Sequence, residues 1–350
     1  MSLELTHSNS RVPLLKCVVW DLDDTIWEGT LLEGGGDALR LGVAELIKGL
    51  DARGVLQSIA SRNDSSAMER LRSFGLDRYF LYPRFSWGRK SESLKEIASA
   101  LNIGVDSLAF VDDQPFERDE VSACLPGVLT VDAGDLSRLL RDPRLPTGGT
   151  TEARQRRQLY QAEINRRVGE ETFQGGREAF LRELGMVVTI RPANDDDLAR
   201  AEELTSRTSQ MNTTGRVYTA RELHDMSRSS AHLVWVAELD DRYGGSGVVG
   251  LAVVTLERGL WVLELLITSC RVVSRGVGGV MLSCLLERAK AAGVRLQALF
   301  IPNEKNRISY VTYKFAGFLE AQTRSDVRVL EHPLVEIRPV PAHVAVVVKG

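Results

Sequence analysis

The sequence predicts an α/β protein of two domains, the first built on a parallel sheet and the second an α+β domain with an antiparallel meander. Three observations support this prediction. The chain has 350 residues, which is long for one domain and ordinary for two. Its first part alternates short apolar runs with amphipathic stretches, the rhythm of βαβ units. Its second part, from Met186 on, contains longer apolar runs separated by turns, as in an antiparallel meander.

The apolar runs of the first part have the character of strands buried on both faces. The run 17–20, Cys-Val-Val-Trp, shows no alternation of apolar and polar residues. Helices between such strands cover both faces of a parallel sheet. The predicted strands are 17–22, 55–60, 108–111 and 128–131, and the predicted helices are 38–53, 65–74, 91–101 and 116–124.

A change of composition marks the boundary between the domains. The segment 141–151 (RDPRLPTGGTT) is rich in Pro, Gly and Thr, and the charged stretch 152–185 behind it has helical spacing. We therefore expect a first domain at 1–146, a linker helix region at 147–186 and a second domain at 187–350. The second domain is predicted to contain strands at 187–191, 232–239, 248–256 and 260–268, a helix at 195–207, and a glycine-rich turn that leads into a further helix.

Composition excludes several classes of function. The formal net charge is −3, so nothing draws the whole chain to nucleic acid or to an anionic membrane. The N-terminus lacks the basic and apolar regions of a secretory signal, and no apolar stretch is long enough to span a bilayer. The four cysteines have no metal-like spacing and are predicted to be free thiols. We expect a soluble protein of the reducing cytoplasm that binds neither nucleic acid nor membrane.

The run 17–20 ends abruptly in an acidic cluster. Asp21, Asp23 and Asp24 follow it in the motif DLDDT. Carboxylates gathered at the end of a buried strand are penalised by desolvation unless a cation compensates them. The carboxyl ends of parallel strands are also where open α/β sheets bind ligands. The cluster therefore predicts a Mg²⁺-dependent phosphoryl site, and the alternative is a solvated acidic turn.

Three further polar elements follow at strand ends or helix starts. Ser61 ends the second run in SIASRND, where its hydroxyl and nearby backbone N–H groups could hold a phosphate. Lys90, before a helix, could neutralise charge on a transferring phosphoryl group. Asp112 and Asp113 end a third run and supply oxygen ligands of the type that Mg²⁺ prefers. Each element alone could be a cap, a surface charge or a turn, but their combination favours one active site.

These motifs, in this order, resemble those of the haloacid dehalogenase superfamily. The resemblance implies an uncapped Rossmann-like domain, because only short segments follow the first two strands. Such an open site suits a macromolecular or carrier-bound substrate. The resemblance also assigns roles. It implies that Asp21 is the nucleophile that forms an aspartyl-phosphate, and that Asp23 is the general acid/base and lends its backbone carbonyl to Mg²⁺. The phosphoryl group would be bound by Ser61, Arg62, Asn63 and Lys90, and the metal site would be completed by Asp112 and Asp113.

Four segments narrow the resemblance further. KCVVWDLDDTIWEGTLLEG, SIASRND, WGRKSESLKEIA and FVDDQPFERDEV are together similar to the FkbH-like enzymes of polyketide pathways. Those enzymes take a three-carbon unit from 1,3-bisphosphoglycerate, remove phosphate and load the glyceryl group on an acyl carrier protein, for polyketide extender or tetronate units. The resemblance therefore implies a glyceryltransferase/phosphatase whose partners are 1,3-bisphosphoglycerate and an acyl carrier protein.

The second domain resembles the GNAT acyltransferases. In LELLITSCRVVSRGVGG a strand is followed by a glycine-rich turn and a helix, as in the loop whose backbone N–H groups bind coenzyme A phosphates. Gly276 and Gly278 fit that loop, whereas Val273 stands where the family has Gln or Arg. The phosphopantetheine of a carrier could use this groove, with no free coenzyme A required. The residues assigned to pantetheine binding are Arg271, Arg275, Gly276, Gly278, Asn306 and Tyr313.

Cys270 is the predicted acyl-carrying nucleophile. It lies at a strand end beside Arg271 and near a predicted helix N-terminus, and these features favour a thiolate. The alternative is a buried structural cysteine. The polar run 203–219 could hydrogen-bond the glyceryl hydroxyls or be a solvated loop. A second hypothesis for the whole chain is a phosphatase whose GNAT-like domain is a non-catalytic protein-binding module.

Overall fold

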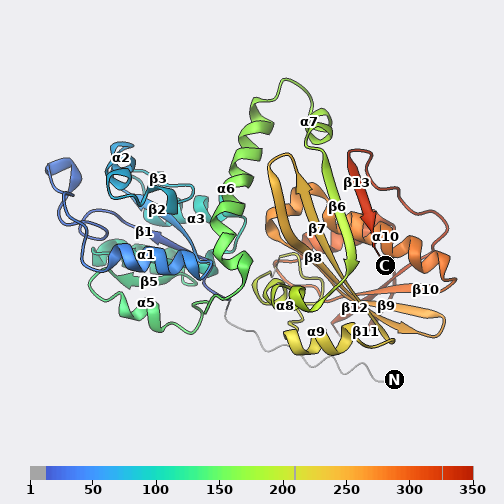
Figure 1. Cartoon of the computed structure of the whole chain (residues 1–350). Coiled ribbons are helices and arrows are strands. Elements are labelled where there is room, and N and C mark those ends of the chain that lie inside the picture. The colour runs from blue at the N-terminus through green and yellow to red at the C-terminus, as the bar shows by residue number, and fades with distance from the viewer. Residues whose placement is uncertain (1–12, 209, 325, 350) are drawn as a thin grey trace. The chain divides into compact units, whose positions relative to one another are not determined.

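The computed structural model describes residues 13–208, 210–324 and 326–349, and these residues divide between Glu163 and Ile164 into two compact units. We call them the first unit and the second unit. Each contains one sheet, with the strand order β3-β2-β1-β4-β5 in the first and β11-β12-β10-β9-β8-β7-β6-β13 in the second (Figure 1). The predicted fold class, a parallel-sheet α/β domain followed by an α+β domain, is confirmed.

The central strand of the first unit is β1, Cys17–Trp20, and each strand pair of this sheet is parallel. All four residues of β1 are buried, as its unbroken apolar run predicts. The other elements are β2 Leu56–Ser61, β3 Arg84–Phe85, β4 Leu108–Asp112, β5 Leu129–Asp132, α1 Val43–Ala52, α2 Ser66–Ser73, α3 Lys90–Leu101, α4 Pro115–Cys124, α5 Ser137–Arg141 and the 3-10 turns η1 Leu31–Glu33, η2 Asp77–Tyr79 and η3 Val105–Ser107.

The register of this sheet brings several strand ends to one edge. Trp20, the last residue of β1, lies opposite Ile59 of β2 and Val111 of β4. The residues that follow these positions, Asp21 and Asp112 among them, therefore emerge together at the carboxyl edge of the sheet, where α/β proteins bind their ligands.

The connection between β1 and α1 is a loop that returns on itself. Trp27 pairs with Leu39 in an antiparallel bridge, and Gly42 then adopts a left-handed conformation with φ of 77°. The predicted helix start at residue 38 is therefore wrong, and α1 begins at Val43. Among the described residues, neither this loop nor the short one after β2 contains an inserted domain.

The second unit contains the predicted antiparallel meander, β7-β8-β9, and β10 joins it parallel to β9. The sequence predicts none of the strands β10 to β13, whose runs are short or, in β11, largely polar. The elements are α6 Thr151–Thr172, which crosses the division between the units, α7 Arg177–Glu183, β6 Met186–Pro192, η4 Asp195–Asp197, α8 Leu198–Arg207, α9 Ala220–Ser227, β7 His232–Asp241, β8 Gly244–Glu257, β9 Leu260–Thr268, η5 Cys270–Arg275, α10 Val277–Ala291, β10 Arg295–Phe300, α11 Arg307–Ala316, β11 Leu319–Arg324, β12 Val327–His332 and β13 Val344–Val348.

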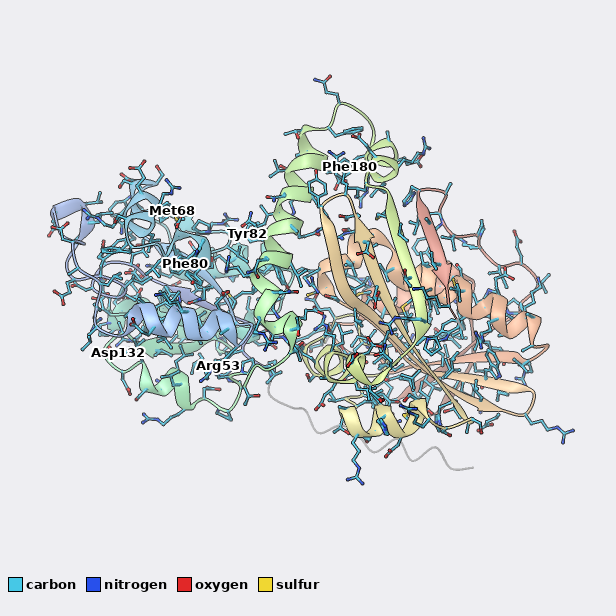
Figure 2. All side chains as sticks on the ribbon, in the orientation of Figure 1. Arg53, Met68, Phe80, Tyr82, Asp132 and Phe180 are labelled. Atoms are coloured by element: carbon cyan, nitrogen blue, oxygen red, sulfur yellow. The ribbon has the colours of Figure 1, made fainter. Side chains whose placement is uncertain are left out.

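This sheet is covered on both faces. Trp235 and Ala237 of β7 belong to the core that includes α10, whereas Val234 and Val236 belong to the core that includes α8 and α9. Alternate residues of a strand point to opposite faces, so the two cores lie on the two sides of the sheet. Phe180 of α7 packs into the first of them (Figure 2). Within the described part of the chain, every helix is too short or too polar to cross a bilayer.

Candidate active site at the carboxyl edge of the parallel sheet

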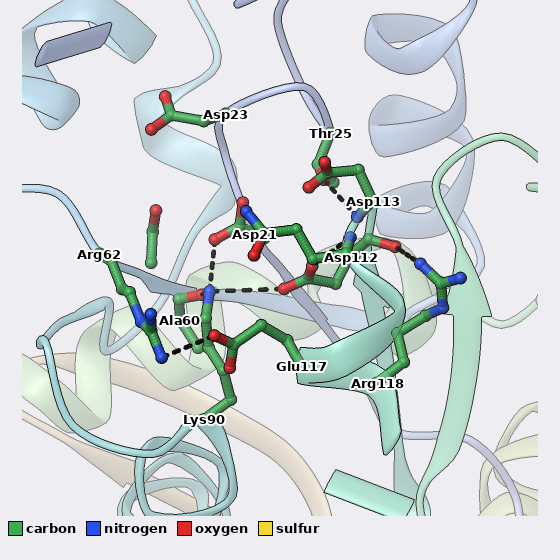
Figure 3. A network of polar contacts seen from close by, with 12 residues as sticks. Asp21, Asp23, Thr25, Ala60, Arg62, Lys90, Asp112, Asp113, Glu117 and Arg118 are labelled. Carbon is green, nitrogen blue, oxygen red and sulfur yellow. Dashed lines mark hydrogen bonds and ion pairs between the residues drawn. The ribbon is translucent and has the colours of Figure 1, made fainter. Parts of the chain in front are cut away.

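A buried lysine joins two buried aspartates at the carboxyl edge of the first sheet (Figure 3). Lys90 begins α3, so its side chain enters the site from the helix N-terminus. Its ammonium pairs with Asp21 Oδ1, lies 3.5 Å from Asp112 Oδ2 and donates a hydrogen bond to the Ala60 carbonyl at 2.6 Å. Lys90, Asp21 and Asp112 are 3, 7 and 1 % exposed. Charges this deeply buried persist only with partners, which is the condition these three groups fulfil for one another.

Three carboxylates converge beside this lysine. One carboxylate oxygen from each of Asp21, Asp112 and Asp113 lies within 4.8 Å of the others. The Asp113 Oδ1 atom is buried and has no hydrogen-bond partner among the described residues. The Asp113 N–H donates to Thr25 Oγ1 at 3.1 Å, which fixes this loop against the DLDDT segment. A set of hard oxygen donors with an unsatisfied buried atom fits Mg²⁺, and Asp21, Asp112 and Asp113 are the residues that would hold it.

The pKa values of the three carboxyl groups in the site are raised above the ordinary aspartate value. Burial, reinforced by the charge of Asp21, raises the pKa of Asp112 to about 7 even though Lys90 lowers it. Burial also raises the pKa of Asp21 and of Asp113 above the ordinary aspartate value. A divalent cation would favour the ionised forms of all three groups, so metal binding at this site releases protons.

The raised pKa of Asp112 predicts how the metal-free protein responds to pH. Above its unfolded pKa near 4 and up to about 7, the folded protein holds a proton that the unfolded chain has lost. The free energy of unfolding contributed by Asp112 therefore falls as pH rises through this window, by up to about 1.4 kcal/mol per unit. Urea unfolding at pH 5 and pH 8 with a chelator would measure the fall. Asp112→Asn should flatten it, and an equal pH slope in both proteins would contradict the prediction.

Asp23, the predicted general acid/base, does not place its side chain in the acidic cluster. Its carboxylate accepts hydrogen bonds from Trp27 Nε1 at 2.8 Å, the Leu31 N–H at 3.0 Å and Asn63 Nδ2 at 2.9 Å. In Figure 3 this carboxylate lies apart from the Asp21–Lys90–Asp112 group. The role of Asp23 in proton transfer and its backbone contact to Mg²⁺ remain predictions.

The predicted phosphate-binding residues after β2 have different surroundings. Ser61 is buried and lies near Asp21, whose pKa it lowers. Arg62 is exposed and forms a 2.6 Å ion pair with Glu117 of α4, which is itself buried. The sequence analysis missed Glu117, because a single glutamate on a helix carries no signal of its own. It also missed Thr25, although this residue stands inside the DLDDT motif.

The predicted acyltransferase residues lie around η5 in the second unit. Cys270 is its first residue and is partly exposed. Gly276 ends η5 in the left-handed conformation, with φ of 70°, and forms the N-cap of α10, so the glycine-rich turn is confirmed as a helix entry. Gly278 lies in the first turn of α10. Backbone N–H groups at such an N-terminus can bind an anion, and their pantetheine role remains a prediction.

Arg271 and Arg275 face inward. Arg271 donates to the Ser246 carbonyl at 3.4 Å, and Arg275 lies 3.5 Å from the fully buried Asp241 carboxylate. Burial lowers the pKa of Arg275 to about 10. Arg166 of α6 pairs with the same Asp241 at 2.6 Å. These contacts fasten η5 to the end of β7, and the binding of pantetheine by the two arginines remains untested.

The strands β9 and β10 diverge beyond their paired residues, and we call the gap between them the fork. The segment around Thr213 lies in this gap. The parallel pairing of the two strands extends to Leu263 and Ala298. Beyond this point Thr213 bonds to both strands. Its N–H donates to the Leu266 carbonyl at 3.3 Å, its hydroxyl accepts from the Leu266 N–H at 3.0 Å, and its carbonyl accepts from the Ile301 N–H at 3.0 Å. The predicted polar run is thus, in part, an inserted strand-like segment.

Asn306 and Tyr313, both assigned to pantetheine binding, hold this inserted segment. The Asn306 amide donates to the carbonyls of Asn212 at 3.1 Å and Ile301 at 2.8 Å. Tyr313 is fully buried beside Thr213, and burial raises the pKa of its hydroxyl. Both residues therefore stabilise the second unit in this conformation, and their contact with a ligand remains a prediction.

Comparisons with known proteins give partial likenesses. No family model matches the chain, and a search of curated proteins found no match. The chain is similar to the N-terminal part of a Bacteroides fragilis protein that contains a phosphatase domain complexed with Mg, at 31 % identity and a TM-score of 0.34, covering 39 % of this chain and 41 % of that one. The chain thus spans about two-fifths of the length of that protein.

Two acetyltransferases give likenesses of similar extent. One is the ribosomal-protein-S18-alanine N-acetyltransferase from Escherichia coli, at 15 % identity and a TM-score of 0.34, covering 43 % of this chain and 96 % of that one. The other is an acetyltransferase of the GNAT family from Streptococcus pneumoniae, at 20 % identity and a TM-score of 0.31, covering 41 % and 98 %. With TM-scores this low, the assignment of the site rests on its own residues and contacts.

Proposed function

We propose that the chain is a Mg²⁺-dependent enzyme that takes the glyceryl unit of 1,3-bisphosphoglycerate, removes phosphate and loads the unit on the phosphopantetheine thiol of an acyl carrier protein. The observation that carries the phosphatase part is the buried group of Lys90, Asp21, Asp112 and Asp113 at the carboxyl edge of the first sheet. Phosphoryl transfer through a covalent intermediate needs a carboxylate nucleophile, and a lysine and a cation site beside it stabilise the charge on the phosphoryl group.

In the phosphatase step an oxygen of Asp21 attacks phosphorus, the bond from phosphorus to the leaving oxygen breaks, and that oxygen takes a proton from Asp23. Lys90 neutralises charge on the phosphoryl oxygens, and Mg²⁺ when bound would add to this neutralisation. Water then attacks the aspartyl-phosphate and gives a proton to Asp23, while the bond between phosphorus and Asp21 breaks. The nucleophile and the acid/base are thereby regenerated.

The open carboxyl edge supports a large substrate. Neither loop that could carry a cap contains an inserted domain. A carrier-bound group can approach such a site without a lid having to open. We therefore propose that the same site serves a three-carbon unit whether it is free or attached to a carrier.

The transfer step is assigned to the second unit. We propose that Cys270, as a thiolate that has given its proton to solvent, attacks the acyl phosphate carbon. A C–S bond forms, the C–O bond to phosphate breaks, and phosphate leaves with that oxygen. The carrier thiol then attacks this thioester and takes the glyceryl group. The partial exposure of Cys270 and its place at the start of η5, the 3-10 helix that leads into α10, support this role. The pantetheine arm is supplied by the carrier, so the reaction requires no free coenzyme A.

Cys270→Ala is predicted to prevent formation of the covalent acyl-enzyme. The enzyme would be incubated with Mg²⁺, 1,3-bisphosphoglycerate and a pantetheinylated carrier, without coenzyme A, and both proteins would be weighed by intact-mass spectrometry. The wild type should give an acylated carrier, and a Cys124→Ala variant, which changes an exposed cysteine on α4, should behave in the same way. An acyl adduct on the Cys270→Ala enzyme would remove the thiol from the mechanism.

A second candidate function has its own support. The fork between β9 and β10 is filled by Thr213, and Val273 replaces the Gln or Arg of the GNAT loop. Both features favour a phosphatase whose second unit is a non-catalytic protein-binding module. This alternative predicts phosphate release with no acylated carrier in the same experiment.

A further inference from the structure

Asn63 lies between the predicted nucleophile and the predicted acid/base. It follows β2 in the loop at the carboxyl edge and is only 3 % exposed. Its Nδ2 donates to Asp23 Oδ2 at 2.9 Å and to Ser61 Oγ at 3.1 Å. Ser61 lies near Asp21, whose pKa it lowers. Asn63 thus hydrogen-bonds both Asp23 and a neighbour of Asp21.

The contact with Ser61 is a donation to its hydroxyl oxygen. A hydroxyl has one proton to donate, and Ser61 therefore keeps this proton for another acceptor. The contact fixes the position of Ser61 relative to Asp23.

The second contact of Asn63 fixes Asp23. One oxygen of this carboxylate accepts from the Trp27 indole and the Leu31 N–H, which both belong to the loop after β1. The other oxygen accepts from Asn63, on the loop after β2. Among the side-chain hydrogen bonds of the described residues, Asn63 is the donor that links Asp23 to the loop after β2. Without it the carboxylate would remain tied to one loop and could rotate about that attachment.

The carbonyl oxygen of Asn63 gives an independent indication of a reacting molecule. Its Oδ1 is buried and has no hydrogen-bond partner among the described residues. Leaving a buried acceptor unsatisfied is unfavourable, so a donor is expected to reach it in the working enzyme. In the proposed mechanism the leaving hydroxyl and the attacking water each carry an O–H group, and both exchange a proton with Asp23.

We propose that Asn63 is a positioning residue that aligns Asp23 and Ser61 about Asp21 and offers its Oδ1 to the O–H group that exchanges a proton with Asp23. This inference rests on the proposed phosphatase function. It differs from the role that the family resemblance implies, in which Asn63 binds the phosphoryl group directly. The two roles make opposite predictions for the affinity of phosphate.

Kinetics with a simple phosphate ester distinguish the two roles. Asn63→Ala should lower kcat for 4-nitrophenyl phosphate about 10- to 100-fold, because it disturbs acid/base catalysis. The inhibition constant of inorganic phosphate should change by less than about twofold, since binding is not its task. In an Asp23→Asn background the further loss should be below about threefold, because residues that act as one unit are not additive. Additive losses, or a phosphate inhibition constant about tenfold higher with kcat unchanged, would overturn the proposal.

A second measurement needs neither metal nor activity. The protein has five tryptophans, so the indole N–H signals in a ¹⁵N-labelled sample are few, and Trp27→Phe identifies the one of interest. Asn63→Ala should shift the Trp27 indole signal in metal-free protein, because the Asp23 acceptor moves. A signal that stays in place would overturn the positioning role.

The control is an asparagine of the same unit outside the site. Asn102 caps the C-terminal end of α3 in the left-handed conformation, and Lys90 lies at the N-terminal end of the same helix, about 18 Å away. Asn102→Gly keeps the left-handed conformation accessible. It should leave kcat and the indole signal unchanged. Asp21→Asn distinguishes a failure of the phosphatase assignment from a failure of the positioning role of Asn63. If phosphate release persists in that variant, the phosphatase assignment itself is wrong, whereas the indole experiment still judges the contact between Asn63 and Asp23.

Discussion

Replacing Asp21 with asparagine should abolish phosphate release. The variant keeps the shape of the side chain but removes the nucleophile that forms the aspartyl-phosphate, and the loss of a nucleophile lowers kcat on the order of 10⁴- to 10⁶-fold. It also removes one of the three carboxylates that converge in the site. Phosphate release from 4-nitrophenyl phosphate, which the Cys270 step does not act on, would be measured with Mg²⁺ present.

The matched control for this variant is the neighbouring acid Asp24. Its backbone has a left-handed conformation with φ of 49°, which asparagine also adopts readily, and its side chain accepts from the Gly29 N–H at 2.8 Å outside the acidic cluster. Asp24→Asn should therefore retain phosphate release. Equal activity in Asp21→Asn and Asp24→Asn would show that the carboxylate of Asp21 is not the nucleophile.

Replacing Lys90 with methionine should reduce both stability and catalysis. The variant leaves Asp21 and Asp112 buried without their cation, and breaking a buried ion pair from one side costs about 3–5 kcal/mol. The loss should be largest at pH 8. At pH 5 the two carboxyl groups, whose pKa values are already raised by burial, take up protons and need no cation. Phosphate release should fall on the order of 10²- to 10³-fold, as for other groups that stabilise developing charge.

Urea unfolding of metal-free protein at the two pH values would measure this stability change. Lys95→Met is the control, because Lys95 lies on the same helix and is exposed. Mg²⁺ should restore part of the stability lost at pH 8 by Lys90→Met, since it supplies the missing positive charge. A loss of the same size at pH 5 and pH 8 would argue that Lys90 contributes by packing and not by its charge.

The gathering of the predicted carboxylates depends on strand ends. Asp21, Asp112 and Asp113 come together because buried apolar runs form parallel strands, and parallel strands in register place their carboxyl ends at one edge. Lys90 joins them from the first residue of α3. A short apolar run identifies a strand from local sequence, and the geometry of a parallel sheet then brings the carboxyl ends of the strands together. The absence of an inserted cap follows in the same way from the lengths of two connections.

The contacts that the sequence does not predict are those made by side chains across loops. Nothing in the spacing of Asp23 and Asn63 shows that their side chains hydrogen-bond over 40 positions. The loop 38–42 has helical apolar spacing, yet pairing of Leu39 with Trp27 and the left-handed Gly42 override it. The same holds for Asn306, which a motif comparison assigns to a ligand and which the fold uses to hold Asn212.

The segment inserted between β9 and β10 also bears on how the protein avoids associating with itself. Two strands that separate leave unpaired N–H and C=O groups along their facing edges, and such edges readily accept a strand from another molecule. Thr213 satisfies the Leu266 and Ile301 amides from within the chain. It does so only after residues more than 50 positions apart have met, so these edges stay exposed until late in folding. The fork is therefore one place where incompletely folded second units are prone to pair with one another.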